Sequence, residues 1–110
     1  MFSPELKKGS TDLLILALLS EQDRHGYDIV RLIDERTAGQ LKFRIGSVYP
    51  ILVRLEDQGF VKGRWVEAVN GPRRRFYRLT AKGRKFFEKE RSNWAAFTAA
   101  VNKIVGPQHA

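Results

Sequence analysis

The stretch from Gly46 to Leu55 reads GSVYPILVRL and combines side chains that rarely share one surface of a soluble protein. One side has the spacing of a single buried helical stripe, formed by Val48, Ile51, Leu52 and Leu55. The opposite side carries a hydroxyl, a phenol, a proline ring and a guanidinium, supplied by Ser47, Tyr49, Pro50 and Arg54. Such a surface at the start of a helix suits insertion into the major groove of DNA. There, N–H groups meet phosphate and side chains meet base edges.

Two interpretations of this surface remain open. Pro50 is tolerated in the first turn of a helix because the first N–H groups have no intrahelical partner. In the DNA-binding interpretation, Tyr49 contacts a phosphate or a base, and Arg54 contacts guanine in bidentate fashion. In the structural interpretation, Tyr49 packs on the preceding helix and Pro50 only rigidifies the helix start.

Three consecutive arginines, Arg73, Arg74 and Arg75, follow a turn signal at Asn70-Gly71-Pro72. Like charges at a turn repel one another, so an anionic partner opposite them would explain their presence. A helix that reads DNA, followed by a basic hairpin, is the layout of a winged helix-turn-helix. The alternative is a winged helix that contacts protein or RNA, but such a module need not carry three arginines here.

The composition narrows the class of protein further. The chain has 110 residues, a formal net charge of +8 and no cysteine, which suits one small domain with an anionic partner and excludes disulfides. The two histidines, His25 and His109, lack a second ligand at metal spacing, and no nucleophile or phosphate-loop motif is present. We therefore expect no enzyme, no metal and no cofactor.

The chain is expected to act in the cytoplasm and away from membranes. The first ten residues lack the apolar core of a signal peptide, and the apolar run Leu13–Leu19 is too short to span a bilayer. A membrane-surface protein would need one continuous basic face, and Glu88 and Glu90 interrupt the basic residues of the last helix.

The pattern predicts an α+β fold that is mainly α: a winged helix-turn-helix at 1–80 and a long C-terminal dimerisation helix with its tail at 81–110. Ser10 or Thr11 caps a first helix. A second helix runs over about 27–37, and the third ends near Gln58 with Gly59 as its stop. Between them, 41–43 is a short extended piece. The strands are 60–67 and 73–79, and the last helix follows the Thr80 cap over about 81–105.

Four ordered stretches resemble the PadR family of bacterial transcriptional regulators: KGSTDLLILALL, HGYDIVRLI, GSVYPILVRLEDQGFV and GPRRRFYRLTAKG. The resemblance covers Lys8 to Gly83, and the single remaining helix is similar to the short branch of that family. It implies a homodimer that represses transcription from a pseudo-palindromic operator in double-stranded DNA. It also implies release by a small molecule or stress signal. On this resemblance the third helix is the recognition helix, Arg73, Arg74 and Arg75 form the wing, and Lys7 and Lys8 touch phosphate.

The last helix carries aromatic and aliphatic residues spaced by seven, which predicts a seam for a second subunit. The all-apolar run of the first helix would be covered by the same contact. The predicted interface residues are Leu13, Leu16, Phe87, Trp94, Phe97, Val101 and Ile104. Trp94 has two interpretations: an interface anchor, or a stacking plate for a small aromatic effector, with Phe97 and Leu16 beside it.

Overall fold

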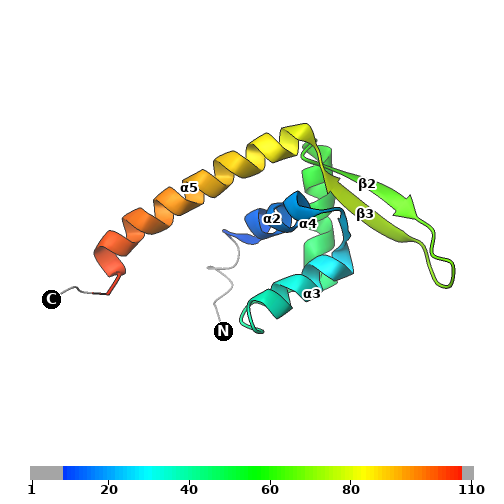
Figure 1. The fold of residues 1–110 in the computed structure, drawn as a ribbon, viewed down its shortest axis with the longest axis horizontal. Coiled ribbons are helices and arrows are strands. Elements are labelled where there is room, and N and C mark those ends of the chain that lie inside the picture. The colour runs from blue at the N-terminus through cyan, green and yellow to red at the C-terminus, as the bar shows by residue number, and fades with distance from the viewer. Residues whose placement is uncertain (1–8, 108–110) are drawn as a thin grey trace.

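The structure, a computed structural model, describes residues 9–107, so the predictions for Lys7, Lys8 and His109 lie outside it. The elements in chain order are α2 (Thr11–Glu21), β1 (Arg24–His25), α3 (Gly26–Arg36), α4 (Ile45–Asp57), β2 (Val61–Val66), β3 (Arg74–Leu79) and α5 (Ala81–Val105). In Figure 1, α2, α3 and α4 gather in the middle, and the β2–β3 hairpin and α5 extend to opposite sides. The predicted fold class is confirmed.

The core lies where α2, α3 and α4 meet the base of the hairpin. The apolar run of α2 supplies Ile15, Leu16, Leu18 and Leu19, all buried. The predicted stripe of α4 is confirmed, because Val48, Leu52 and Leu55 are buried and Ile51 packs partly buried against them. Burial of the stripe orients α4, so its other side faces outward.

The sheet has three strands rather than the two that the sequence indicated. Its order is β1-β3-β2, and β1 pairs antiparallel with β3 through Arg24↔Tyr77 and His25↔Phe76. A two-residue strand is too short to show an alternating pattern, so nothing in the sequence marked it. The segment 41–43, expected to be extended, forms no strand in the described chain.

Residues with positive φ follow α4, at the predicted stop Gly59, and also follow α3. Gly59 has φ 82°, and Ala38 and Gly39, after α3, have φ 51° and 78°. Thr80 caps α5, since its hydroxyl accepts a hydrogen bond from Gly83 N–H. Ser10 occupies the N-cap of α2, although its side chain does not make the capping hydrogen bond.

Four residues form what we call the wing-base junction: Gly59, Phe60, Thr80 and Gly83. Thr80 N–H donates to the Phe60 carbonyl at 3.0 Å, and the Thr80 hydroxyl donates to the Gly59 carbonyl at 2.7 Å. A Cβ on Gly83 would lie 1.9 Å from the Phe60 oxygen, so this position requires glycine. The junction ties the end of α4 and the hairpin base to the start of α5.

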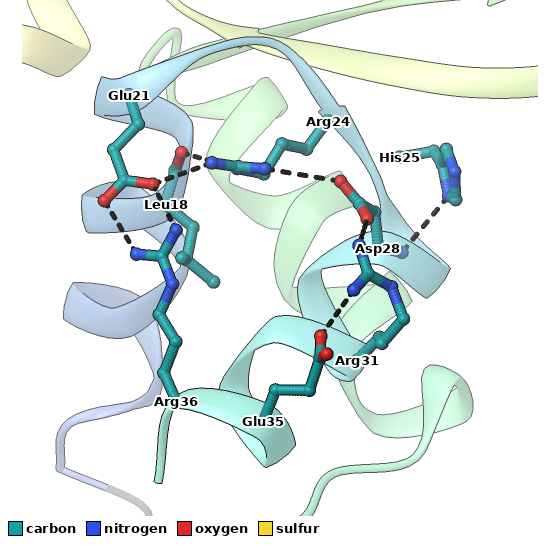
Figure 2. A network of polar contacts seen from close by, with 8 residues as sticks. All are labelled: Leu18, Glu21, Arg24, His25, Asp28, Arg31, Glu35 and Arg36. Atoms are coloured by element: carbon teal, nitrogen blue, oxygen red, sulfur yellow. Dashed lines mark hydrogen bonds and ion pairs between the residues drawn. The ribbon is translucent and has the colours of Figure 1, made fainter.

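A network of ion pairs joins α2, β1 and α3 around the buried Arg24 (Figure 2). Its guanidinium donates to the Leu18 carbonyl at 2.9 Å and to Glu21 at 2.7 Å, and it reaches Asp28 at 3.4 Å. The buried charge is thereby paired and hydrogen-bonded, which such a group requires. The β1 strand is therefore held by a side chain as well as by its pairing with β3.

The outer part of the network continues on α3. Arg36 donates to both oxygens of Glu21 at 2.7 and 2.8 Å, and Arg31 bonds Asp28 and Glu35. The hydrogen bonds from Arg36 and Arg24 hold the pKa of Glu21 at about 2. Burial opposes ionisation of Asp28, yet its hydrogen bonds from Arg31 and Arg24 keep its pKa below the ordinary value.

This network predicts loss of stability in acid. Glu21 has a lower pKa folded than unfolded, so its contribution is complete above pH 4.5 and is lost as the pH falls toward 2. Over this pH range we expect the free energy of unfolding of Glu21→Gln to fall by about 1 kcal/mol less than that of the parent. The difference is small because water screens the half-exposed carboxylate. Urea unfolding at several pH values measures the difference. Glu67→Gln is the control. An equal fall in the free energy of unfolding in the parent and in Glu21→Gln as the pH is lowered would contradict the prediction.

Candidate nucleic-acid interface

The outward side of α4 is exposed over most of its length. Gly46, Ser47, Tyr49, Pro50 and Arg54 are all exposed, as the DNA-binding interpretation requires. Tyr49 is not buried against α3, which favours a role at the surface. Pro50 lies one turn further into the helix than predicted, because α4 begins at Ile45. Since proline has no N–H, it cannot donate the helical hydrogen bond to the Gly46 carbonyl.

Arg54 is held by α2 rather than pointing directly outward. Its Nη2 donates to both carboxylate oxygens of Asp12, at 2.8 and 2.9 Å, and its Nη1 reaches Gln58 at 3.4 Å. The hydrogen bond to Asp12 raises the pKa of Arg54. A contact between Arg54 and a guanine therefore requires Arg54 to share this carboxylate or to leave it.

The three wing arginines have different environments, and Arg75 is paired with a carboxylate. Its guanidinium is 3.2 Å from Glu56, near the end of α4, and its side chain is only 26% exposed. It also lies 5.4 Å from the ring centre of Trp65, its partner in the β2–β3 register. Arg75 therefore links the hairpin to α4, and a contact between Arg75 and DNA would require it to share or leave Glu56.

Glu56 completes this link. It accepts a hydrogen bond of 2.8 Å from Gly63 N–H on β2, as well as its contacts with Arg75. A Cβ on Gly63 would lie 2.7 Å from Arg75 Nε, so the guanidinium passes directly over the glycine. These contacts set the position of the hairpin relative to α4.

Arg73 and Arg74 remain exposed, and each lies over an aromatic ring. The Arg73 guanidinium carbon is 4.7 Å from the ring centre of Trp65, and that of Arg74 is 5.8 Å from the ring centre of Tyr27. Sequence reasoning missed both aromatic residues. Counting outward from a two-residue turn at Asn70-Gly71 would pair Trp65 with Phe76, whereas the observed register pairs it with Arg75. Tyr27 comes from another element, so no local signal marked it either.

A cavity of about 290 Å³, which we call the wing cleft, separates α4 from the hairpin. Its walls include Tyr27, Tyr49, Trp65, Arg73, Arg74 and Tyr77. Burial, reinforced by the neighbouring Tyr49, raises the pKa of Tyr77. Burial and then the charge of Arg74 lower the pKa of His25, whose Nδ1 accepts a hydrogen bond from Asp28 N–H, so this histidine is neutral at neutral pH.

The predicted seam of α5 divides into a buried and an exposed part. Phe87 is 3% exposed and Leu16 of α2 is 0% exposed, because α5 lies over the core in its first turns. Their assignment to a subunit interface is therefore corrected: both belong to the core of the chain itself. Farther along, the exposed side chains are Trp94, Phe97, Val101 and Ile104.

A second cavity, the α2–α5 cavity, has a volume of about 570 Å³. Leu13, Leu16, Trp94 and Phe97 contribute its apolar wall, so the structure brings together the residues expected around an effector. Asp12, Arg54 and Glu90 contribute charged groups. Ile51 and Arg54 come from α4, and this cavity therefore touches the helix whose outer face is the candidate DNA contact.

The described chain offers neither a cluster of metal-binding side chains nor a membrane-spanning helix. Across residues 9–107, no group of three or more His, Cys, Asp or Glu side chains is arranged to hold a metal ion. None of the helices in this range is long and apolar enough to cross a bilayer.

The sequence matches a family model described as "Transcriptional regulator PadR-like family" over residues 15–89. The chain is 32% identical over 83 residues to "Transcriptional regulator YqjI" of Escherichia coli strain K12, covering 76% of this chain and 38% of that protein. It is also 28% identical over 95 residues to "Uncharacterized protein X" of Lysinibacillus sphaericus, covering 86% and 87% of the two chains.

Solved structures are similar over nearly the whole chain. A transcriptional regulator from Clostridium thermocellum superposes with a TM-score of 0.86 at 30% identity, covering 96% of this chain and 99% of that one. A PadR-like transcription factor from Bacteroides fragilis gives a TM-score of 0.77 at 31% identity, covering 92% and 95%. The long C-terminal helix is thus part of the shared architecture.

The link between Glu56 and Arg75 predicts coupling in a double-mutant cycle. We expect Glu56→Gln and Arg75→Gln each to destabilise the fold, with a coupling energy of about 0.5–1 kcal/mol between them, because the pair is partly shielded from water. Urea unfolding of both single variants and the double variant measures it. Arg78→Gln, an exposed change on the same strand, is the control, and additive losses for Glu56 and Arg75 would disprove the link.

Proposed function

Because this chain belongs to the PadR-like family of transcriptional regulators, we propose that it is a homodimeric repressor whose operator is pseudo-palindromic and whose release is triggered by a small aromatic effector. The chain is a DNA-binding regulator, and regulators of this family are generally dimers. The observation that carries the proposal is the juxtaposition of the exposed face of α4 with a hairpin that presents Arg73 and Arg74.

In this proposal α4 enters the major groove with its N-terminal half leading. Ser47, Tyr49 and Pro50 then face base edges and thymine methyl groups, and Arg54 contacts a guanine when it shares or leaves Asp12. Arg73 and Arg74 contact the backbone from the wing, and Lys7 and Lys8 would add phosphate contacts before α2. The phosphate contacts supply much of the affinity, whereas the base contacts supply the sequence preference.

Dimerisation is supported by the apolar surface of α5 beyond the core. Trp94 is 43% exposed and Phe97 60% exposed, and Val101 and Ile104 extend the same surface. Aromatic residues of this kind are common anchors of protein interfaces. A second α5 or α2 packed on this surface would remove it from water. It would place two α4 helices on one face of the DNA, about 34–36 Å apart for half-sites one helical turn apart.

The effector is proposed to bind in the α2–α5 cavity, beside Trp94 and Phe97. The cavity has the size and the mixture of apolar walls with a few charged groups that small-molecule sites have. Since Arg54 is part of its wall, an effector there would contact α4 directly. It would also bias the dimer geometry through α5, and DNA affinity would fall by the difference in effector affinity between the two states.

The first prediction from this proposal concerns DNA. We expect selection from a random duplex library to recover a two-fold-symmetric site. Affinity for that site should fall steeply with salt, by about 0.9 in log K per phosphate contact for each tenfold rise in salt. Fluorescence anisotropy with the selected duplex measures the slope, and a scrambled duplex is the control. Equal binding to both duplexes would contradict sequence-specific regulation.

The second prediction concerns the effector. Trp65→Phe leaves Trp94 as the one tryptophan of the chain, so its fluorescence reports on the α2–α5 cavity. We expect planar aromatic acids or amines that quench this fluorescence also to weaken binding of the selected duplex, because the two sites are linked. Ligands that quench Trp94 but leave DNA affinity unchanged would make Trp94 an interface anchor without an effector role.

A further inference from the structure

The only cation of α4 is compensated by an acidic residue of another helix. α4 has 13 residues, and Arg54 is the one lysine or arginine among them. Its guanidinium donates from Nη2 to both carboxylate oxygens of Asp12, at 2.8 and 2.9 Å, across 42 positions of the sequence. A helix proposed to enter DNA therefore brings no uncompensated positive charge of its own, which is the opposite of what affinity for phosphate favours.

The position of Asp12 favours this pair without making it strong. Asp12 lies in the first turn of α2, where the N-terminus of the helix stabilises a negative charge. The pair is nevertheless accessible to water, because the side chain of Asp12 is 40% exposed and that of Arg54 is 48% exposed. Exposed ion pairs contribute little to stability, so this pair can open when a stronger partner for Arg54 is present.

The nitrogen that Asp12 holds is also the nitrogen that a guanine needs. A guanidinium presents two parallel N–H bonds along only two of its edges, Nη1 with Nη2 and Nε with Nη2, and both edges include Nη2. Guanine accepts such a pair of N–H bonds at O6 and N7 in the major groove. A guanine bound along either edge would bring these acceptor atoms next to the carboxylate oxygens of Asp12, and the two sets of acceptors would repel each other.

In an inference that rests on the proposed DNA binding by α4, we propose that Asp12 is a positioning residue that restrains Arg54 and competes with the operator for it. In the free protein Asp12 holds the guanidinium, and a guanine at the correct position of the operator takes its place. Asp12 and Arg54 both line the α2–α5 cavity, so the position of α2 sets how readily the pair opens. The affinity for the operator is thus lower than α4 would reach without Asp12.

The test uses the full chain, the selected duplex and duplexes in which each G·C pair of the half-site is replaced in turn. Fluorescence anisotropy first identifies the base pair that Arg54 reads, because its replacement weakens binding of the parent but not of Arg54→Gln. We expect Asp12→Asn to bind the selected duplex about two- to fivefold more tightly than the parent, the range that an exposed ion pair contributes. This gain should be lost on the duplex that lacks the guanine read by Arg54.

Three comparisons separate the restraint from a general effect of charge. Asp57→Asn removes another exposed carboxylate, at the end of α4, and should change the binding of both duplexes equally. In an Arg54→Gln background, Asp12→Asn should also act equally on both duplexes, because no guanidinium remains to be released. Asp12→Glu keeps the carboxylate and should bind like the parent. Circular dichroism confirms folding, and Asp12→Ser, which is also uncharged, replaces Asp12→Asn if that variant fails to fold.

An ion pair that only joined α2 to α4 would give a different result. Its loss would leave the affinity for the selected duplex equal to that of the parent or lower. That outcome, an equal gain on both duplexes, or the absence of any base pair read by Arg54 would overturn the inference while leaving DNA binding intact. Failure of the parent to select any duplex would overturn the proposed function as well.

Discussion

The contact between Gly83 and the carbonyl of Phe60 is the constraint on which the arrangement of the other elements depends. No side chain larger than hydrogen fits there, since a Cβ would lie 1.9 Å from the carbonyl oxygen. Through this contact and the hydrogen bonds of Thr80, the first turn of α5 is placed against the start of β2. The last residue of α4, Asp57, is three positions before Phe60. The positions of α4, the β2–β3 hairpin and α5 are therefore all fixed at the wing-base junction.

The arginines of the chain illustrate how the same residue type is directed to different tasks by its neighbours. Arg24 is buried and compensated by Glu21 and Asp28, so it serves the fold. Arg75 is directed by Glu56 toward α4 and serves the placement of the hairpin. Arg73 and Arg74, which lie over Trp65 and Tyr27, are exposed and present their charge to the surroundings of the wing. The number of arginines in a stretch therefore indicates less about its exposed charge than the side chains that each arginine contacts.

Most of the fold was predictable from local patterns. The α4 stripe, the glycine stop at 59 and the Thr80 cap depend on residues a few positions apart, and the predicted 81–105 helix agrees with α5 as observed. The errors arose where the deciding contact is distant in sequence. Arg75 meets a residue 19 positions earlier, and β1 is a strand only because β3 lies beside it. The heptad spacing of α5 treated Phe87 like Trp94, although only the core beneath α5 distinguishes them.

The length of α5 has a mechanical consequence. At 25 residues it extends about 37 Å from the wing-base junction, in a molecule 60 Å long. Over that lever arm, a tilt of about 5° at the junction displaces the far end by about 3 Å, close to the rise of one DNA base pair. A protein of this shape converts small angular errors at Gly83 into misplacement on the scale of a nucleotide. The stiffness of the contact at Gly83 thus limits how accurately the far end of α5 is positioned relative to the exposed face of α4.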